Sequence, residues 1–259
     1  MNIAILGAGN VAWHLSKAFI MAGHPVRQIW NRTVEKAADL SFEIGGNSIS
    51  DLSQIKEEID LIVITVSDEA IEQVASSLKP RDHQIVVHTS GSTSINVLKP
   101  YAKQVGVIYP LQTFSKDVAI NFSEIPFFLE ACRPDVLTDL KRVVGQITKK
   151  VEEADSAQRM NLHISAVFAC NFTNHLYSIA SDILEKYNLS FDYIKPLILE
   201  TANKVLQATP KDVQTGPARR HDKNTMQKHL DMLSSDLDKQ ELYRLISQRI
   251  VKMYDENRA

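Results

Sequence analysis

The sequence predicts an α/β fold in which helices cover a doubly wound parallel sheet, followed by a separate all-α domain. Three observations lead to this prediction. A glycine-rich turn follows the first apolar run, short apolar runs then alternate with helical patterns, and strand-like runs disappear after Ser156. We expect the two domains to cover residues 1–154 and 155–259.

The amino-terminal turn has the spacing of a nucleotide-binding motif. An apolar run ends on Gly7, and Gly7-x-Gly9-x-x-Ala12 then opens an amphipathic helix. Gly7 permits a tight turn, Gly9 lets the backbone approach a pyrophosphate, and the small Ala12 lets helix and strand pack closely. We therefore predict a Rossmann-type dinucleotide site that also includes Asn10 and Val11. The alternative is an ordinary turn between strand and helix.

Further apolar runs and helical patterns complete the first domain. Leu61 to Val66 is apolar almost throughout, which predicts a strand buried on both faces. The other expected strands are Ile3 to Leu6, Val26 to Trp30, Ile85 to Thr89, Gly106 to Tyr109, Phe127 to Leu129 and a short segment near Val151, with helices over Glu35 to Phe42 and Val136 to Ile147.

The second half carries only helical patterns, with apolar residues at helical spacing. The expected helices run from about Ala157 to Tyr187, Phe191 to Ala208, Asp222 to Ser235 and Asp238 to Tyr254.

Composition excludes several classes of partner. The formal charge of -2 and the isoelectric point near 6.4 indicate no binding surface for nucleic acid or an anionic membrane. Cys132 and Cys170 form neither a disulfide framework nor a metal motif. No apolar stretch approaches the roughly 20 residues of a membrane span, and the N-terminus lacks a basic signal region. A cytoplasmic protein without a metal is expected.

The residues after the second strand indicate which dinucleotide binds. NAD sites place an acidic residue there to bind the ribose hydroxyls, but this chain has Asn31-Arg32-Thr33. A guanidinium beside amide and hydroxyl groups suits a 2′-phosphate, so the sequence predicts NADP as cofactor. The alternative is that Arg32 is simply an exposed arginine.

Polar residues also follow the central strands, at the sheet edge where the nicotinamide is expected. Ser67, Thr89 and Ser90 are predicted to contact the cofactor there. Alternatively, polar residues in these loops only cap the next helices.

Two segments of the helical domain could bind or protonate a substrate. On one helix, His163, Asn171 and His175 share a side, which predicts a general acid and a substrate-fixing amide; a helix-helix interface is the alternative. Arg219 lies in the cationic loop from Gln214 to Asp222 and suits a carboxylate or phosphate. Its alternative is a solvated turn in which Asp222 caps a helix.

Together these motifs resemble a bacterial family of Rossmann-like NADP oxidoreductases that carry a helical carboxy-terminal domain of unknown function. The resemblance spans essentially the whole chain. It rests on the glycine turn, His88 to Gly91, Pro110 to Phe114, Ala166 to Phe172, and Thr215 to Arg219. More distantly, the layout is similar to pyrroline-5-carboxylate reductase, ketopantoate reductase, 3-hydroxyisobutyrate dehydrogenase and deazaflavin-dependent NADP oxidoreductases.

The resemblance implies a homodimer formed through the helical domain, which in relatives closes the active site over the nicotinamide. The sequence departs from the relatives at one point, and this limits what the resemblance implies. Two of the relatives carry a catalytic lysine on the first helix of the second domain, and no lysine occurs here between Arg159 and Lys186. The relatives' proton chemistry therefore does not transfer to this chain.

The leading hypothesis is an NADP(H)-dependent oxidoreductase that transfers hydride to or from a small anionic keto or imino substrate in the cleft between the domains. One alternative is a non-catalytic NADP-binding sensor, which the missing lysine keeps open. Another is an enzyme that uses a deazaflavin as partner substrate.

Overall fold

The computed structural model describes residues 1–255 and divides into two compact units. Unit 1 covers Met1–Asn171 and unit 2 begins at Phe172. This division falls inside the helix expected to open the second domain, because the start of that helix packs into unit 1. The expected boundary after residue 154 stays a prediction.

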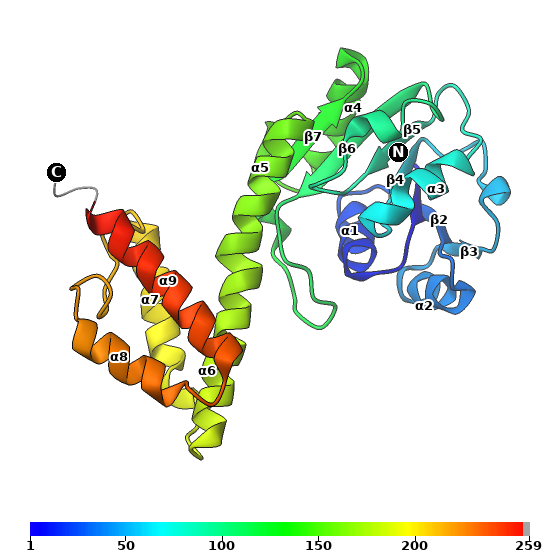
Figure 1. The fold of residues 1–259 in the computed structure, drawn as a ribbon. Helices are drawn as coiled ribbons and strands as arrows, with labels where there is room; N and C mark the ends of the chain where they lie inside the picture. The colour runs from blue at the N-terminus through cyan, green and yellow to red at the C-terminus, as the bar shows by residue number, and fades with distance from the viewer. Residues whose placement is uncertain (256–259) are drawn as a thin grey trace. The chain divides into compact units, whose positions relative to one another are not determined.

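Unit 1 is built on one eight-stranded sheet in the order β3-β2-β1-β4-β5-β6-β7-β8 (Figure 1). All neighbours are parallel except β6 and β7. Because strand order reverses between β1 and β4, the carboxyl ends of these two strands form the switch point where ligands bind in such sheets. The strands are β1 Ile3–Leu6, β2 Val26–Trp30, β3 Asn47–Ile49, β4 Leu61–Ile64, β5 Ile85–His88, β6 Gln104–Pro110, β7 Phe127–Ala131 and β8 Val151–Glu153.

The sheet separates two hydrophobic cores. Alternate residues of β1 point to opposite faces: Ile3 and Ile5 join one core, and Ala4 and Leu6 the other. The first core includes residues of α1 Asn10–Met21, α2 Val34–Ile44 and α4 Pro134–Val144, and the second includes residues of α3 Ile71–Ser76. Short 3-10 turns lie at η1 Leu52–Gln54, η2 Asp68–Ala70, η3 Ile95–Val97 and η4 Phe122–Glu124. The doubly wound α/β prediction is confirmed.

The long helix expected from Ala157 to Tyr187 is interrupted. Helix α5 covers Ser156–Ala166, a π-helical segment covers Val167–Phe172, and α6 covers Thr173–Lys186. A π segment takes more residues per turn than an α-helix, so the regular wheel that placed Asn171 and His175 beside His163 does not hold here.

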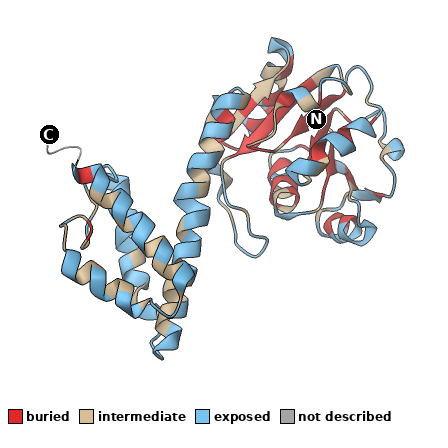
Figure 2. Ribbon diagram, in the orientation of Figure 1, coloured by how far each residue is buried: buried red, intermediate tan, exposed pale blue. Residues whose placement is uncertain are grey.

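Unit 2 consists of helices, as predicted, but buries little. Besides α6, its described residues form a 3-10 turn at η6 and the helices α7, α8 and α9 (Figure 1). Figure 2 shows its residues mostly exposed; among the described ones only Ala218 and Tyr254 are buried. The remaining elements are η6 Phe191–Tyr193, α7 Lys195–Gln207, α8 Lys223–Met232 and α9 Leu237–Asp255.

Candidate functional site

The turn between β1 and α1 is shaped for close approach of a ligand. Gly7 has φ +127°, and a Cβ there would lie 2.5 Å from Thr65 Oγ1. At Gly9 a Cβ would meet nothing within 4 Å, so the space beside it is open. Gly9 also precedes α1 without a capping side chain, and the first turn of α1 has no acidic residue. The exposed amides and the helix dipole therefore favour an anion at this turn.

The loop between β2 and α2 adds two cations. The Asn31 side-chain amide donates to the carbonyl of Thr33 over 2.9 Å and so holds the loop. Arg32 and Lys36 are exposed, and within residues 1–255 neither side chain forms an ion pair. Both charges are therefore available to a phosphate.

These two loops line one cavity of about 430 Å³ at the carboxyl ends of β1, β2 and β4. The cavity gathers six of the predicted cofactor residues, and it adds Lys36, which sequence reasoning missed. Lys36 follows the Asn-Arg-Thr run by one helical turn, so its spacing was a usable signal. The six residues are Gly7, Gly9, Asn31, Arg32, Thr33 and Ser67.

Four other predicted cofactor residues do not line this cavity. Val11 packs against the first core, and the Asn10 side-chain amide donates to the carbonyl of Phe114 over 2.9 Å. Thr89 is half-buried. The Ser90 hydroxyl donates to Thr93 Oγ1 over 3.0 Å, which holds the loop after β5 in shape.

That loop is anchored by a buried arginine that sequence reasoning did not single out. Arg159 on α5 donates to the carbonyl of Ser90 over 3.1 Å and to that of Thr93 over 2.6 Å. The Arg159 guanidinium also pairs with the Glu130 carboxylate from β7. Ser94 caps η3 by accepting from the amide of Asn96, so capping accounts for part of this polar loop.

His163 is the predicted catalytic residue that unit 1 places near its sheet. Its Nδ1 lies 3.2 Å from the hydroxyl of Tyr109 near the end of β6, and the two rings meet edge to face. Gly91 packs against both rings. Tyr109 was missed because it lies 54 positions earlier in the chain, a separation that no local pattern reveals.

The other three predicted catalytic residues do not line the cavity of unit 1. Asn171 ends unit 1 and His175 lies in the first turn of α6, and both are exposed. The Arg219 guanidinium lies 3.9 Å from the centre of the Tyr254 ring, a cation-π contact within unit 2. Asp222 caps α8 by accepting from the amide of Thr225 over 3.0 Å, as the turn interpretation of this loop required.

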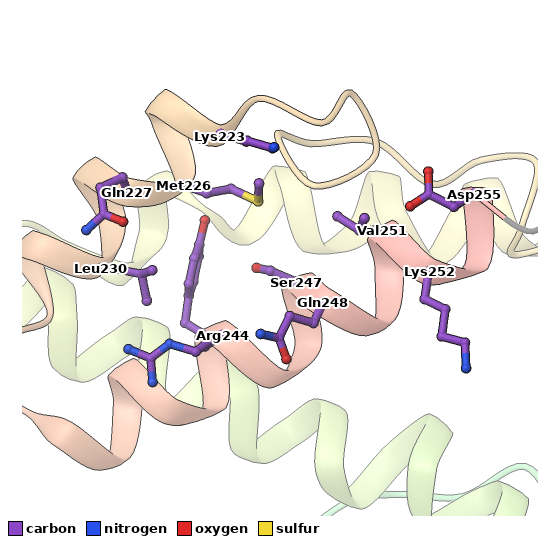
Figure 3. Close-up of a pocket in the computed structure, with 11 residues that line it drawn as sticks. Lys223, Met226, Gln227, Leu230, Arg244, Ser247, Gln248, Val251, Lys252 and Asp255 are labelled. Carbon is purple, nitrogen blue, oxygen red and sulfur yellow. The ribbon is translucent and has the colours of Figure 1, made fainter.

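Unit 2 also contains a groove of about 570 Å³ between α8 and α9 (Figure 3). Its walls are apolar at Met226, Leu230 and Val251, and Lys223 and Arg244 stand at its rim. Among the described residues no glycine lines this groove, whereas Gly7 and Gly9 line the cavity of unit 1.

Within residues 1–255 no three His, Cys, Asp or Glu side chains gather as metal ligands. In the same range, no helix combines the length and apolarity needed to cross a bilayer.

Two family models match the chain. Residues 2–91 match the model described as NADP oxidoreductase coenzyme F420-dependent. Residues 125–250 match a domain of unknown function, DUF2520. A pyrroline-5-carboxylate reductase 2 from Dictyostelium discoideum is 28% identical over 129 residues, which cover 48% of this chain and 42% of that protein. The chain thus matches less than half the length of this curated relative.

Solved structures give a fuller match. A protein from Bacteroides fragilis, assigned as an NADP oxidoreductase, is 41% identical, with 97% of this chain and 98% of that chain covered and a TM-score of 0.92. A reductive aminase from Aspergillus terreus, in complex with NADPH and ethyl levulinate, is 16% identical, with 98% and 94% covered and a TM-score of 0.69. The aminase shares the fold, whereas the Bacteroides protein shares the sequence too. The chain belongs to the family of NADP oxidoreductases in which this nucleotide-binding domain precedes DUF2520.

Proposed function

We propose that the protein is an NADPH-dependent reductase that delivers hydride to the carbonyl or imine carbon of a small anionic molecule. The observation that carries the proposal is the convergence of the Gly7 to Gly9 turn with Arg32 and Lys36 in one cavity. The turn suits the pyrophosphate, and the two exposed cations suit a 2′-phosphate. The substrate class is supported by the relatives, since pyrroline-5-carboxylate reductase is named for an imino acid.

In this proposal the nicotinamide supplies the hydride, and the protein binds, orients and protonates. The amides before and in the first turn of α1 hold the pyrophosphate, while Arg32 and Lys36 hold the 2′-phosphate. His163 supplies the proton, and Asn171, His175 and Arg219 are proposed to bind the substrate. The cation-π contact of Arg219 with Tyr254 would hold that guanidinium in place.

A titration tests the cofactor. NADPH should bind at least about tenfold more tightly than NADH, because a charge-assisted phosphate contact contributes about 1.5 to 3 kcal/mol. Arg32→Ala should remove most of this preference, and Lys36→Ala part of it. Lys99→Ala, an exposed lysine in the segment before β6, is the matched control and should change nothing. An equal affinity for NADPH and NADH, or a preference unchanged in Arg32→Ala, would refute the assignment.

A turnover assay tests the chemistry. Keto acids, imino acids and a deazaflavin are each offered with NADPH, and oxidation of the nicotinamide is followed by absorbance. The deazaflavin is included because the matching family model is described as coenzyme F420-dependent. Turnover of a keto or imino acid supports the proposal. Tight NADPH binding without any turnover would point to a sensor, and turnover of the deazaflavin alone would replace the substrate class.

We further propose that unit 2 forms a homodimer. Helix α7 exposes four large apolar side chains: Leu197 at 65%, Leu199 at 63%, Val205 at 44% and Leu206 at 83%. Leu199 and Leu206 are seven positions apart and lie on the same face of α7, and exposed apolar side chains on one face are characteristic of a surface that another chain covers. Light scattering after gel filtration should give twice the mass of one chain, and Leu206→Glu should shift it toward one. A single-chain mass for the unaltered protein would contradict this proposal.

A further inference from the structure

The side chains of Tyr109 and His163 contact each other at the carboxyl edge of the sheet. The Tyr109 hydroxyl lies 3.2 Å from His163 Nδ1, and the ring centres are 6.2 Å apart at 69°. A Cβ at Gly91 would lie 2.7 Å from Tyr109 Cζ and 2.9 Å from His163 Cβ, so the loop after β5 closes directly on both side chains. Neither ring can rotate freely in such packing.

The pair is held by residues that reach it from several elements. Tyr109 is 7% exposed and lies near the end of β6. Arg159, one turn before His163 on α5, bonds the carbonyls of Ser90 and Thr93 on either side of Gly91. Asp68, which follows β4, bonds the hydroxyl of Ser92 in the same loop. The hydrogen bonds thus connect this loop to the segment beside Ser67, which lines the proposed cofactor cavity.

The surroundings of Tyr109 favour the neutral phenol. Burial raises the pKa of Tyr109, the positive charge of Arg159 opposes that rise, and Asp68 adds to it. The phenol therefore keeps its proton at neutral pH and can donate it to the ring nitrogen of His163. Arg159 stabilises the phenolate when the proton leaves.

We propose that Tyr109 is a positioning residue that donates its hydroxyl proton to Nδ1 of His163 and so fixes the imidazole proton on Nε2. This inference rests on the proposed reductase function and names its proton donor. The Nε2–H bond of His163 breaks, and its proton goes to the carbonyl oxygen or imine nitrogen of the substrate. Bound NADPH would supply the hydride that forms the new C–H bond. Nδ1 takes the Tyr109 proton as Nε2 loses its own. A solvent proton later reaches Nε2, and Nδ1 returns its proton to the Tyr109 phenolate, which restores the starting tautomer.

Nitrogen NMR of the histidines tests the pair without any turnover, because the shifts of Nδ1 and Nε2 distinguish the two neutral tautomers. The full chain is labelled at histidine with ¹⁵N, and the signals of His163 are assigned from their loss in His163→Gln. The Nε2–H tautomer should dominate at pH 8. Tyr109→Phe, which keeps the ring packing, should give a mixture of both tautomers, and Tyr101→Phe is the matched control that should not. A dominant Nδ1–H tautomer, or an unchanged Tyr109→Phe spectrum, would overturn the proposal.

Kinetics supply a second readout. Once a substrate is identified, Tyr109→Phe should lower kcat about 10- to 100-fold, within the range for general acid catalysis, with little change in KM. NADPH affinity should stay as in the unaltered protein. Loss of NADPH affinity in Tyr109→Phe would contradict a role confined to proton transfer. By contrast, a failure of the unaltered protein to bind NADPH refutes the reductase function and leaves the tautomer result standing.

Discussion

The guanidinium of Arg159 is fully buried and pairs with the Glu130 carboxylate, so helix α5 is anchored to strand β7. The same guanidinium bonds two carbonyls of the loop after β5. One side chain thereby ties together a helix, a strand and a loop that are far apart in the sequence.

Removal of the Arg159 guanidinium should lower the free energy of unfolding. Arg159→Leu leaves Glu130 largely buried without its partner, and breaking a buried ion pair costs about 3 to 5 kcal/mol of unfolding free energy. The exposed pair of Arg142 with Asp139 is the control, and Arg142→Leu should cost less than about 1 kcal/mol. Urea unfolding of both variants measures the difference. Equal losses would show that the buried pair contributes no more than a surface one.

Stability should fall in mild acid because of His88. The pKa of His88 is lowered to about 4, mainly by burial and also by the positive charge of the neighbouring Arg159. Because the unfolded histidine titrates near 6.5, the unfolded state binds more protons between these values, and stability falls as pH drops from 6.5 toward 4. The loss attributable to His88 is at most about 3 kcal/mol.

Paired unfolding curves at pH 7, 5.5 and 4.5 isolate this contribution from that of the carboxylates. His88→Asn cannot titrate in this range, so its stability should fall less steeply with pH than that of the unaltered protein. Parallel pH dependences for the two proteins would mean that His88 titrates normally in the fold.

Substitution of Gly7 should lower stability, whereas substitution of Gly9 should weaken NADPH binding. Gly7→Ala forces a side chain into φ +127° and against Thr65, so it should destabilise the fold by about 1 to 3 kcal/mol or more. Gly9→Ala adds a methyl group in open space, so thermal unfolding should be unchanged while NADPH binds much more weakly. Thermal melts and NADPH titrations of both variants check this split. Unchanged NADPH affinity in Gly9→Ala would show that the pyrophosphate lies elsewhere.

The loop after β6 should loosen when its contact with α1 is removed. His14 Nε2 lies 2.9 Å from the carbonyl of Ser115, and Asn10 bonds the neighbouring carbonyl of Phe114. His14→Ala should therefore speed amide hydrogen exchange in residues 114–118. His83→Ala removes a similar bond to the carbonyl of Glu57 and is the control, which should leave this loop unaffected. Equal exchange in both variants would contradict the role of His14.

Two of the expected strands have the predicted bounds, whereas the strand expected from Leu61 to Val66 ends at Ile64. Ile3–Leu6 and Val26–Trp30 begin and end as expected, because a strand in a parallel sheet must be apolar on one or both faces. Strand β3, Asn47–Ile49, was missed because this short edge strand shows no apolar alternation. The π segment at Val167–Phe172 was also missed, since its residues keep an ordinary helical pattern.

In the candidate site, too, some features were predictable from the sequence and others were not. By itself, the sequence determined the glycine turn, the absence of an acid after β2 and the presence of Arg32, because these features are local and their spacing carries the chemistry. Only the tertiary structure brought Lys36 into the same cavity as the turn, placed Tyr109 against His163 and buried Arg159 on Glu130. The last two contacts join residues that are distant in the chain, and they form only when the sheet aligns its carboxyl ends and α5 packs against them.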